Sequence, residues 1–190
     1  MCVMATTTPM LKNYEIVIGV AGGIAAYKAA ALTSQLVQQG ARVTAVLTRN
    51  GKRFIGTSTF AALTGRPVVS RSFDAAYPLG AHIELAAKAH VIIVAPATAD
   101  LLAKAAHGMA DDVLSTLLLC AECPVLYAPA MNAAMWAKSS VQRNVDMLHR
   151  DGATIIPPET GWLSCRQTGA GRMAEPTDIM DAITSALTRG

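Results

Sequence analysis

The chain of 190 residues has few charged side chains and few cysteines, and it contains no long uninterrupted apolar run. A bilayer span needs about 20 apolar residues, so we expect no membrane segment. The N-terminus lacks the basic end and the apolar stretch of a signal peptide, and we expect a flexible tail over residues 1–13. The lysines and arginines are scattered rather than clustered, which argues against a nucleic-acid partner.

Four cysteines are present, at Cys2, Cys120, Cys123 and Cys165. So few thiols without a signal sequence indicate a reducing cytoplasm, where disulfides are rare. The spacing of Cys120 and Cys123 is that of half a zinc or redox site, but no second pair or nearby histidine completes it. We therefore expect no metal, with Cys120 closing a buried helix and Cys123 leading into a strand.

Apolar residues make up 52% of the chain and follow two alternating patterns. Short runs rich in Val and Ile are typical of buried parallel strands, whereas longer Ala- and Leu-rich stretches have helical spacing. We predict strands at 15–20, 42–47, 91–95, 125–128 and 154–156, helical stretches at 23–39, 51–63, 82–88, 98–121, 133–150 and 176–188, and loops at 67–79 and 157–175. The alternation predicts a single doubly wound α/β domain over 14–190, Rossmann-like or flavodoxin-like, with a parallel sheet between helices.

Glycines follow the first predicted strand where a helix begins. Gly22 and Gly23, followed by Ile24, would let backbone N–H groups approach an anion at the helix N-terminus. The segment is not a Walker A loop, because Lys28 is neither preceded by Gly nor followed by Ser or Thr. It is not the dinucleotide fingerprint either, because Ala21 replaces a required Gly and no acidic residue follows the second strand.

Small and polar residues also follow the other predicted strands, at the edge where doubly wound sheets bind ligands. Thr48, Arg49 and Asn50 supply a hydroxyl, a cation and an amide, which suit a phosphate better than a ribose. Thr98, Ala99, Asp100 and Leu101 follow the strand at 91–95, with Asp111 farther along the same stretch. Ala130, Asn132 and Met135 follow the strand at 125–128. Helix capping explains Thr98 and Asp111. Asn132 could equally cap a helix or donate from its NH₂ group to a substrate carboxylate.

With these stretches the chain resembles the homo-oligomeric flavin-containing cysteine decarboxylases, and among them the phosphopantothenoylcysteine decarboxylases. The matching stretches, in order, are 22–24 (Gly-Gly-Ile), 82–85 (His-Ile-Glu-Leu), 95–100 (Ala-Pro-Ala-Thr-Ala-Asp), 129–136 (Pro-Ala-Met-Asn-Ala-Ala-Met-Trp) and 165–173 (Cys-Arg-Gln-Thr-Gly-Ala-Gly-Arg-Met). The resemblance covers roughly residues 14–176. The stretch that begins Pro-Ala-Met-Asn is its most specific part.

The resemblance implies FMN as cofactor and a homotrimer, or a multiple of trimers, with flavin at the subunit boundary. It places FMN against Gly22, Gly23, Ile24, Thr48, Arg49, Asn50, Thr98, Ala99, Asp100, Leu101 and Ala130. It implies that His82 is a catalytic residue supplied across the boundary, and that Asn132 holds the cysteine carboxylate with Met135 beside it. It places Cys165 in a flap that closes on the substrate.

The implied reaction is the decarboxylation of 4'-phosphopantothenoylcysteine to 4'-phosphopantetheine in coenzyme A biosynthesis, by a cytoplasmic carbon–carbon lyase. An ordinary cysteine has no electron sink for the carbanion that CO₂ loss would leave. The implied chemistry is oxidation of the thiol by flavin to a thioaldehyde, CO₂ loss into the C=S bond, and hydride return with a proton from Cys165. His82 would act as acid–base or position the substrate.

Two positions depart from the family pattern: Arg166 follows the cysteine where Gly is common, and Ala21 stands where many members have Ser. Three alternatives remain beside the main hypothesis. A peptide-cysteine decarboxylase would stop at the enethiol and would not need Cys165. A non-catalytic regulatory flavoprotein would not need His82, Asn132 and Cys165 together. A flavin prenyltransferase relative fits the Pro-Ala-Met-Asn stretch poorly.

Overall fold

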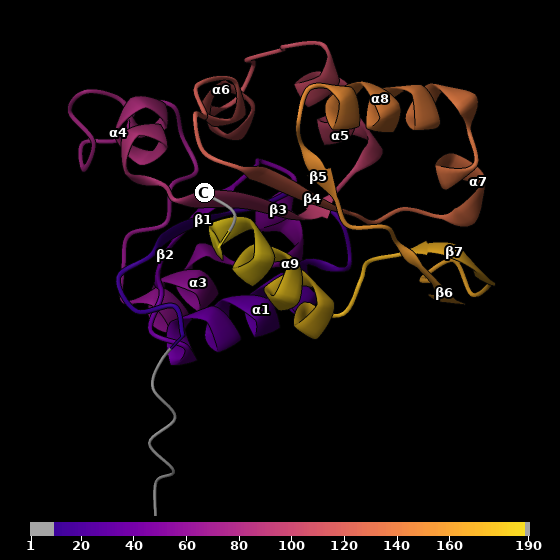
Figure 1. Ribbon diagram of the computed structural model, residues 1–190, viewed down its shortest axis with the longest axis horizontal. Helices are drawn as coiled ribbons and strands as arrows, with labels where there is room; N and C mark the ends of the chain where they lie inside the picture. The colour runs from indigo at the N-terminus through magenta and orange to yellow at the C-terminus, as the bar shows by residue number, and fades with distance from the viewer. Residues whose placement is uncertain (1–9, 189–190) are drawn as a thin grey trace, which may run out of the picture.

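The computed structural model describes residues 10–188, which form a five-stranded sheet between two layers of helices (Figure 1). The strands are β1 (Glu15–Val20), β2 (Arg42–Leu47), β3 (Val91–Ala97), β4 (Val125–Pro129) and β5 (Thr154–Ile155). They lie in the order β2-β1-β3-β4-β5, and every neighbouring pair is parallel. This is the flavodoxin-like order, whose topology reverses between β1 and β3. The predicted doubly wound α/β class is therefore confirmed.

Helices cover both faces of the sheet, which explains why its strands are continuously apolar. One face carries α1 (Ala26–Gln38), α3 (Thr57–Thr64) and α9 (Pro176–Thr188); the other carries α4 (Ala81–Lys88), α5 (Ala99–Ala106), α6 (Val113–Leu119) and α8 (Ser139–Arg150) (Figure 1). Along β1, Ile16 and Ile18 pack into the core beneath α1 and α9, whereas Val17 packs into the core on the opposite face. Both sets are buried, so no polar alternation remains in the sequence.

Three of the predicted helical stretches are divided in two. The stretch 51–63 contains α2 (Gly51–Phe54) and α3, separated at Ile55, whose backbone is extended. The stretch 98–121 contains α5 and α6, because Gly108 takes a positive φ of 64° and Asp112 starts a new helix. The stretch 133–150 contains α7 (Ala133–Trp136) and α8, separated at the extended Lys138. Each break is a local backbone change that apolar spacing does not reveal.

The segment 157–175, predicted as a loop, contains an antiparallel hairpin of β6 (Glu159–Trp162) and β7 (Thr168–Arg172). Its strands hold Gly161, Gly169 and Gly171, and glycine weakens the sequence signal of a strand. Contact with the loop after β4 fixes its position: Met131 N–H donates to the carbonyl of Gly171 at 3.0 Å. A side chain at Gly171, where φ is +126°, would overlap the carbonyl oxygen of Met131.

The flexible tail predicted over residues 1–13 extends too far, because the chain already joins the core at Leu11. Leu11 is only 1% exposed and packs into the core on the α1 side, and its N–H donates to the carbonyl of Gln39 at 3.0 Å. Residues 1–9, the rest of the predicted tail, lie outside the described residues. Within 10–188, no helix combines the length and apolar character needed to span a bilayer. Cys120 ends α6, a helix with several buried residues, as predicted, and its own side chain is exposed.

Candidate functional site

A cleft of about 940 Å³ opens at the carboxyl ends of β1 to β4. Its walls come from the segments that follow these strands and from the β6–β7 hairpin. All eleven residues expected to bind the cofactor line it: Gly22, Gly23, Ile24, Thr48, Arg49, Asn50, Thr98, Ala99, Asp100, Leu101 and Ala130. Asn132 and Met135 line it as well. The structure thus gathers residues more than 100 positions apart at the point where the strand order reverses.

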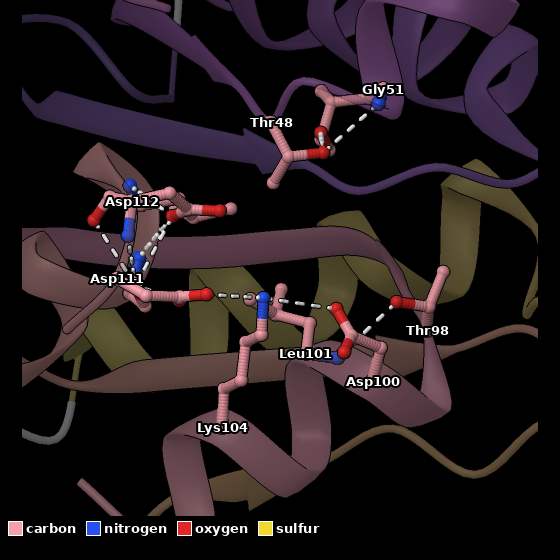
Figure 2. A network of polar contacts seen from close by, with 11 residues as sticks. Thr48, Gly51, Thr98, Asp100, Leu101, Lys104, Asp111 and Asp112 are labelled. Atoms are coloured by element: carbon pink, nitrogen blue, oxygen red, sulfur yellow. Dashed lines mark hydrogen bonds and ion pairs between the residues drawn. The ribbon is translucent and has the colours of Figure 1, made fainter. Parts of the chain in front are cut away.

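Two backbone segments pack tightly at one end of the cleft. A methyl group on Gly22 would overlap Asn50, and one on Gly51 would overlap the carbonyl oxygen of Val20. Thr48 joins the segments, because its hydroxyl donates to the carbonyl of Val20 at 3.3 Å. The same oxygen accepts from Gly51 N–H at 2.9 Å within the loop after β2 (Figure 2). Glycine therefore lets the loop after β1 and the loop after β2 touch, and the result is a wall made mainly of backbone beside the N-terminus of α1.

The wall formed by α5 carries an ion-pair network. Lys104 Nζ lies 3.3 Å from Asp100 and 2.9 Å from Asp111, so it stands between two carboxylates (Figure 2). Thr98 caps α5 by accepting from Leu101 N–H at 3.3 Å, as predicted. Asp111 is not the cap that the sequence suggested, because Asp112 caps α6 through the N–H groups of residues 114 and 115. Asp111 instead ties the start of α6 to α5.

This network makes a testable prediction about the titration of Asp111. The hydrogen bond from Lys104 holds the pKa of the Asp111 carboxyl below its usual 3.8. A pKa lower in the folded state means that the pair stabilises the fold above the unfolded-state pKa, and that this stabilisation is lost as pH falls through the folded-state value. In Lys104→Met we expect the carboxyl ¹³C midpoint of Asp111 to rise towards 3.8. Lys138→Met, outside this network, should leave it unchanged, and no rise in Lys104→Met would contradict the prediction.

Asn132 stands at the start of α7 and also lines the cleft. Its Oδ1 accepts a hydrogen bond from Met135 N–H at 2.8 Å, which confirms that it caps this helix. The cap uses only the carbonyl side of the amide. The side chain is exposed, and no described residue accepts from its NH₂ group. Capping therefore orients a free donor at the cleft, so the two interpretations of Asn132 are compatible.

The β6–β7 hairpin covers another side of the cleft, and we call it the flap (residues 159–172). Trp162, Leu163 and Ser164 line the cleft, whereas Cys165 is exposed at the adjoining turn. Leu163 O accepts from the N–H of residue 166 at 2.9 Å, and Leu163 N–H donates to the carbonyl of residue 167 at 2.8 Å. Cys165 is therefore held at the tip of a tight turn beside the cleft, not on its wall.

Arg166 occupies the strained position of this turn. Its φ is 63°, in the left-handed region that costs a residue with a side chain roughly 1–2 kcal/mol. A three-residue hairpin loop of this kind ordinarily has glycine there. The geometry gives a physical reason for the glycine that the resemblance led us to expect after the cysteine.

His82 does not reach the cleft of its own chain. It lies in the first turn of α4, after Gly80, whose φ is 97°, and it is not among the lining residues. Its Nδ1 is the one buried side-chain nitrogen or oxygen atom that has no hydrogen-bond partner among the described residues. Within one chain, the structure therefore separates His82 from Asn132 and Cys165, the other residues expected to act on substrate.

Sequence reasoning missed several residues that line the cleft. Lys28 and Arg172 lie on its wall, and Tyr27 and Trp162 are large exposed side chains beside it. Trp162 lies in the segment 157–175, where the resemblance places the flap that carries Cys165, so its place in that segment was a usable signal. Lys28 gave no signal, because a lysine on a helix is ordinarily solvated.

Within residues 10–188, no group of His, Cys, Asp or Glu is arranged to hold a metal.

Comparison with known proteins places the chain among flavoproteins. Residues 4–188 match the Flavoprotein family. The coenzyme A biosynthesis bifunctional protein CoaBC of Mycobacterium tuberculosis is 47% identical over 165 residues, which cover 87% of this chain and 39% of that protein. The protein of the same name from Bacillus subtilis is 46% identical over 172 residues, covering 90% of this chain and 42% of that one. The chain thus spans about two fifths of the length of these relatives.

Solved structures agree with the sequence comparison. The FMN-dependent cysteine decarboxylase SpaF superposes with a TM-score of 0.81 at 37% identity, covering 93% of this chain and 97% of that one. A PPC decarboxylase with a cysteine-to-serine substitution, complexed with pantothenoylaminoethenethiol, gives a TM-score of 0.81 at 28% identity over 90% of this chain and 97% of that one. With the family match extending over nearly the whole sequence, the chain belongs to the Flavoprotein family.

Proposed function

We propose that this protein is a carbon–carbon lyase that decarboxylates 4'-phosphopantothenoylcysteine to 4'-phosphopantetheine with FMN as cofactor, a step of coenzyme A biosynthesis. The observation that carries the proposal is the single cleft that joins the eleven expected cofactor residues to Asn132 and to the flap. The relatives named for coenzyme A biosynthesis and the PPC decarboxylase structure support this substrate. A cytoplasmic location belongs to the proposal, since Cys120, Cys123 and Cys165 are free thiols.

The cleft fits FMN in position and in chemistry. Flavodoxin-like sheets bind FMN at the switch point between β1 and β3, where this cleft lies. The backbone wall at Gly22 and Gly23 and the Thr48–Asn50 segment would hold the phosphate at the N-terminus of α1, where the helix dipole favours an anion. The start of α5 and Ala130 would face the ring. Bound FMN supplies the reversible two-electron oxidation that gives a cysteine thiol an electron sink for CO₂ loss.

Adding a methyl group at Gly22 is expected to weaken FMN binding without unfolding the protein. In Gly22→Ala the new group would overlap Asn50, so the loop after β2 must move away from the phosphate position. Overpacking of this kind costs about 1–3 kcal/mol, which corresponds to roughly 5- to 150-fold weaker binding. Quenching of flavin fluorescence measures the affinity. Gly56→Ala is the matched control, because its methyl group would meet nothing within 4 Å; equal affinity in the two variants would refute the prediction.

At the substrate end, three parts of the chain would act on the cysteinyl group. The free NH₂ of Asn132 would donate to the carboxylate and fix its orientation, while the cap keeps the amide from rotating. Met135 and Trp162, both exposed at the cleft, would cover the substrate and exclude water when the flap closes. Closing the flap would bring Cys165 Sγ over the cleft, where its proton is delivered to a substrate carbon. The enethiol and the saturated thiol differ by two hydrogens, of which one would come from Cys165 as a proton and the other from reduced FMN as a hydride.

The proposal includes a homotrimer, because one chain does not bring His82 to its own cleft. Leu79 and Ile83, beside His82, are large apolar side chains that are 73% and 50% exposed, which supports a subunit contact at α4. Mixing His82→Asn with Asn132→Ala subunits after dissociation tests the arrangement. We expect the mixture to recover activity that neither variant has alone, since some clefts then combine an intact Asn132 with an intact partner histidine. No recovery in trimers shown by mass analysis to be mixed would contradict it.

Substrate preference tests the proposal against a peptide-cysteine decarboxylase. CO₂ release is measured without air from 4'-phosphopantothenoylcysteine and from a peptide that ends in cysteine. We expect kcat/KM to favour the pantothenoyl substrate by at least about a hundredfold, a size that buried polar recognition readily reaches. The opposite preference would replace this proposal with the peptide-modifying function. If the FMN-loaded protein releases CO₂ from neither substrate, the result would favour a regulatory flavoprotein.

A further inference from the structure

Lys28 is a buried lysine on the helix that begins at the cofactor end of the cleft. It lies in the first turn of α1 and is only 5% exposed. Its Nζ donates to the carbonyl of Met173 at 2.8 Å and to the Glu175 carboxylate at 2.9 Å. A charge removed from water in this way is tolerated only when acceptors surround it. Both of its acceptors belong to the segment that leaves the flap, about 145 positions farther along the chain.

Glu175 connects Lys28 to the flap. The same carboxylate pairs with Arg172, the last residue of β7. The Arg172 side chain lies across β6, so close that a methyl group on Gly161 would come within 2.9 Å of its Cδ. Two ion pairs therefore connect α1 through Glu175 to β7, and the packing of the Arg172 side chain on Gly161 extends the contact to β6. Lys28 also holds the pKa of Glu175 below its usual value, so the carboxylate is charged at neutral pH.

The flap also contacts the loop before α7 and α7 itself. Its second anchor is the contact of Gly171 with Met131, at the loop before α7. A third contact lies nearer the turn, where a methyl group on Gly169 would come within 2.8 Å of Ala133 Cβ in α7. The turn that carries Cys165 is exposed beyond these contacts. The ion pair at the base and the packing on α7 together set the orientation of the hairpin, and this orientation decides where the exposed Cys165 turn stands above the cleft.

We propose that Lys28 and Glu175 form an ionic latch that positions the flap relative to the cofactor helix. The latch fixes the base of the hairpin, and through it the height and direction of the Cys165 turn. Both are positioning residues, since they act through the flap and not on the reacting carbon. The claim that the latch holds the flap in place is mechanical and does not depend on the proposed function. The expected effect of the latch on the reaction product does rest on that function.

Limited trypsin digestion tests the mechanical claim without substrate. Arg166 is exposed at the tip of the flap, so trypsin cleavage after it reports opening of the hairpin. In Lys28→Met and in Glu175→Gln we expect this cleavage to accelerate about tenfold, the size expected from losing a charged hydrogen bond. Cleavage after Arg150, an exposed site at the end of α8, should keep its rate.

A second ion pair in the same chain supplies the matched control. Arg66 and Glu15 lie 2.7 Å apart at the amino end of the sheet, away from the cleft. Arg66→Met removes this pair, and Glu15→Gln removes it together with the pair between Glu15 and Arg42. We expect no faster cleavage after Arg166 in either. Equal acceleration in control and latch variants would reduce the latch to general stability and overturn the proposal, as would unchanged cleavage in the latch variants.

The product mixture gives a readout that a purely structural role would not change. A displaced Cys165 delivers its proton poorly, so in the latch variants we expect the share of enethiol among the decarboxylated products to rise at least about fivefold. General destabilisation would lower the enethiol and the saturated thiol in the same proportion. Such a proportional loss would count against the latch. If the parent protein releases no CO₂, the proposed function fails, and the trypsin result alone decides the latch.

Discussion

Replacing Cys165 with serine is expected to leave CO₂ loss in place and to stop the reaction at the enethiol. In the proposed reaction, CO₂ loss would need the oxidised substrate and the carboxylate contact at Asn132, neither of which involves the turn at the tip of the flap. Formation of the saturated thiol needs a proton delivered there, and a serine hydroxyl is a far weaker acid than a thiol. We expect the yield of 4'-phosphopantetheine to fall at least about a hundredfold, as for loss of a general acid. Mass spectrometry separates the two products.

Cys120 supplies the control for this substitution. It is also an exposed cysteine, at the end of α6, and it does not line the cleft. Cys120→Ser should therefore give the parent product at the parent rate. If Cys165→Ser still yields mainly the saturated thiol, the proton comes from another group, and the flap would serve only to cover the substrate.

Two substitutions at Asn132 are expected to separate its structural role from its binding role. Asn132→Asp keeps an oxygen that can accept from Met135 N–H, so the cap on α7 should survive. It replaces the donor NH₂ group with a negative oxygen, which repels a substrate carboxylate. We expect kcat/KM for CO₂ release to fall at least about a hundredfold, with little change in thermal stability.

The companion variant removes both roles. Asn132→Ala should lose the same carboxylate contact and also about 1 kcal/mol of stability from the missing cap. Thermal unfolding and CO₂ release are measured on both proteins. The binding role is wrong if Asn132→Asp keeps near-parent activity, because only capping would then be required at this position.

The parallel sheet and the cleft were predictable because both depend on short-range patterns. Runs such as 91–95 are apolar at every position, which predicts a strand covered on both faces. The ends of such strands converge at one edge, so the polar residues after them predict one site. This reasoning placed Thr48, Thr98 and Asn132 on the same cleft, where the structure has them.

The unpredicted features depend on contacts distant in sequence. The burial of Lys28 follows from Glu175, 147 positions away, and helical spacing cannot report it. The β6 and β7 strands are rich in glycine, and the contact between Gly171 and Met131 fixes their place. Asp111 pairs with Lys104 instead of capping α6, since the neighbouring aspartate takes the cap. In each case a tertiary contact overrides what the local pattern favours.

The product formed from 4'-phosphopantothenoylcysteine in the absence of air tests the central claim most directly. The purified protein is loaded with FMN, incubated with this substrate, and the product is weighed by mass spectrometry. The account predicts a product lighter than the substrate by CO₂ alone, because one cycle oxidises and then reduces the same molecule. Unchanged substrate in the presence of FMN-loaded protein would contradict the assignment of substrate. A product lighter by CO₂ and two further hydrogens would contradict the role given to the flap.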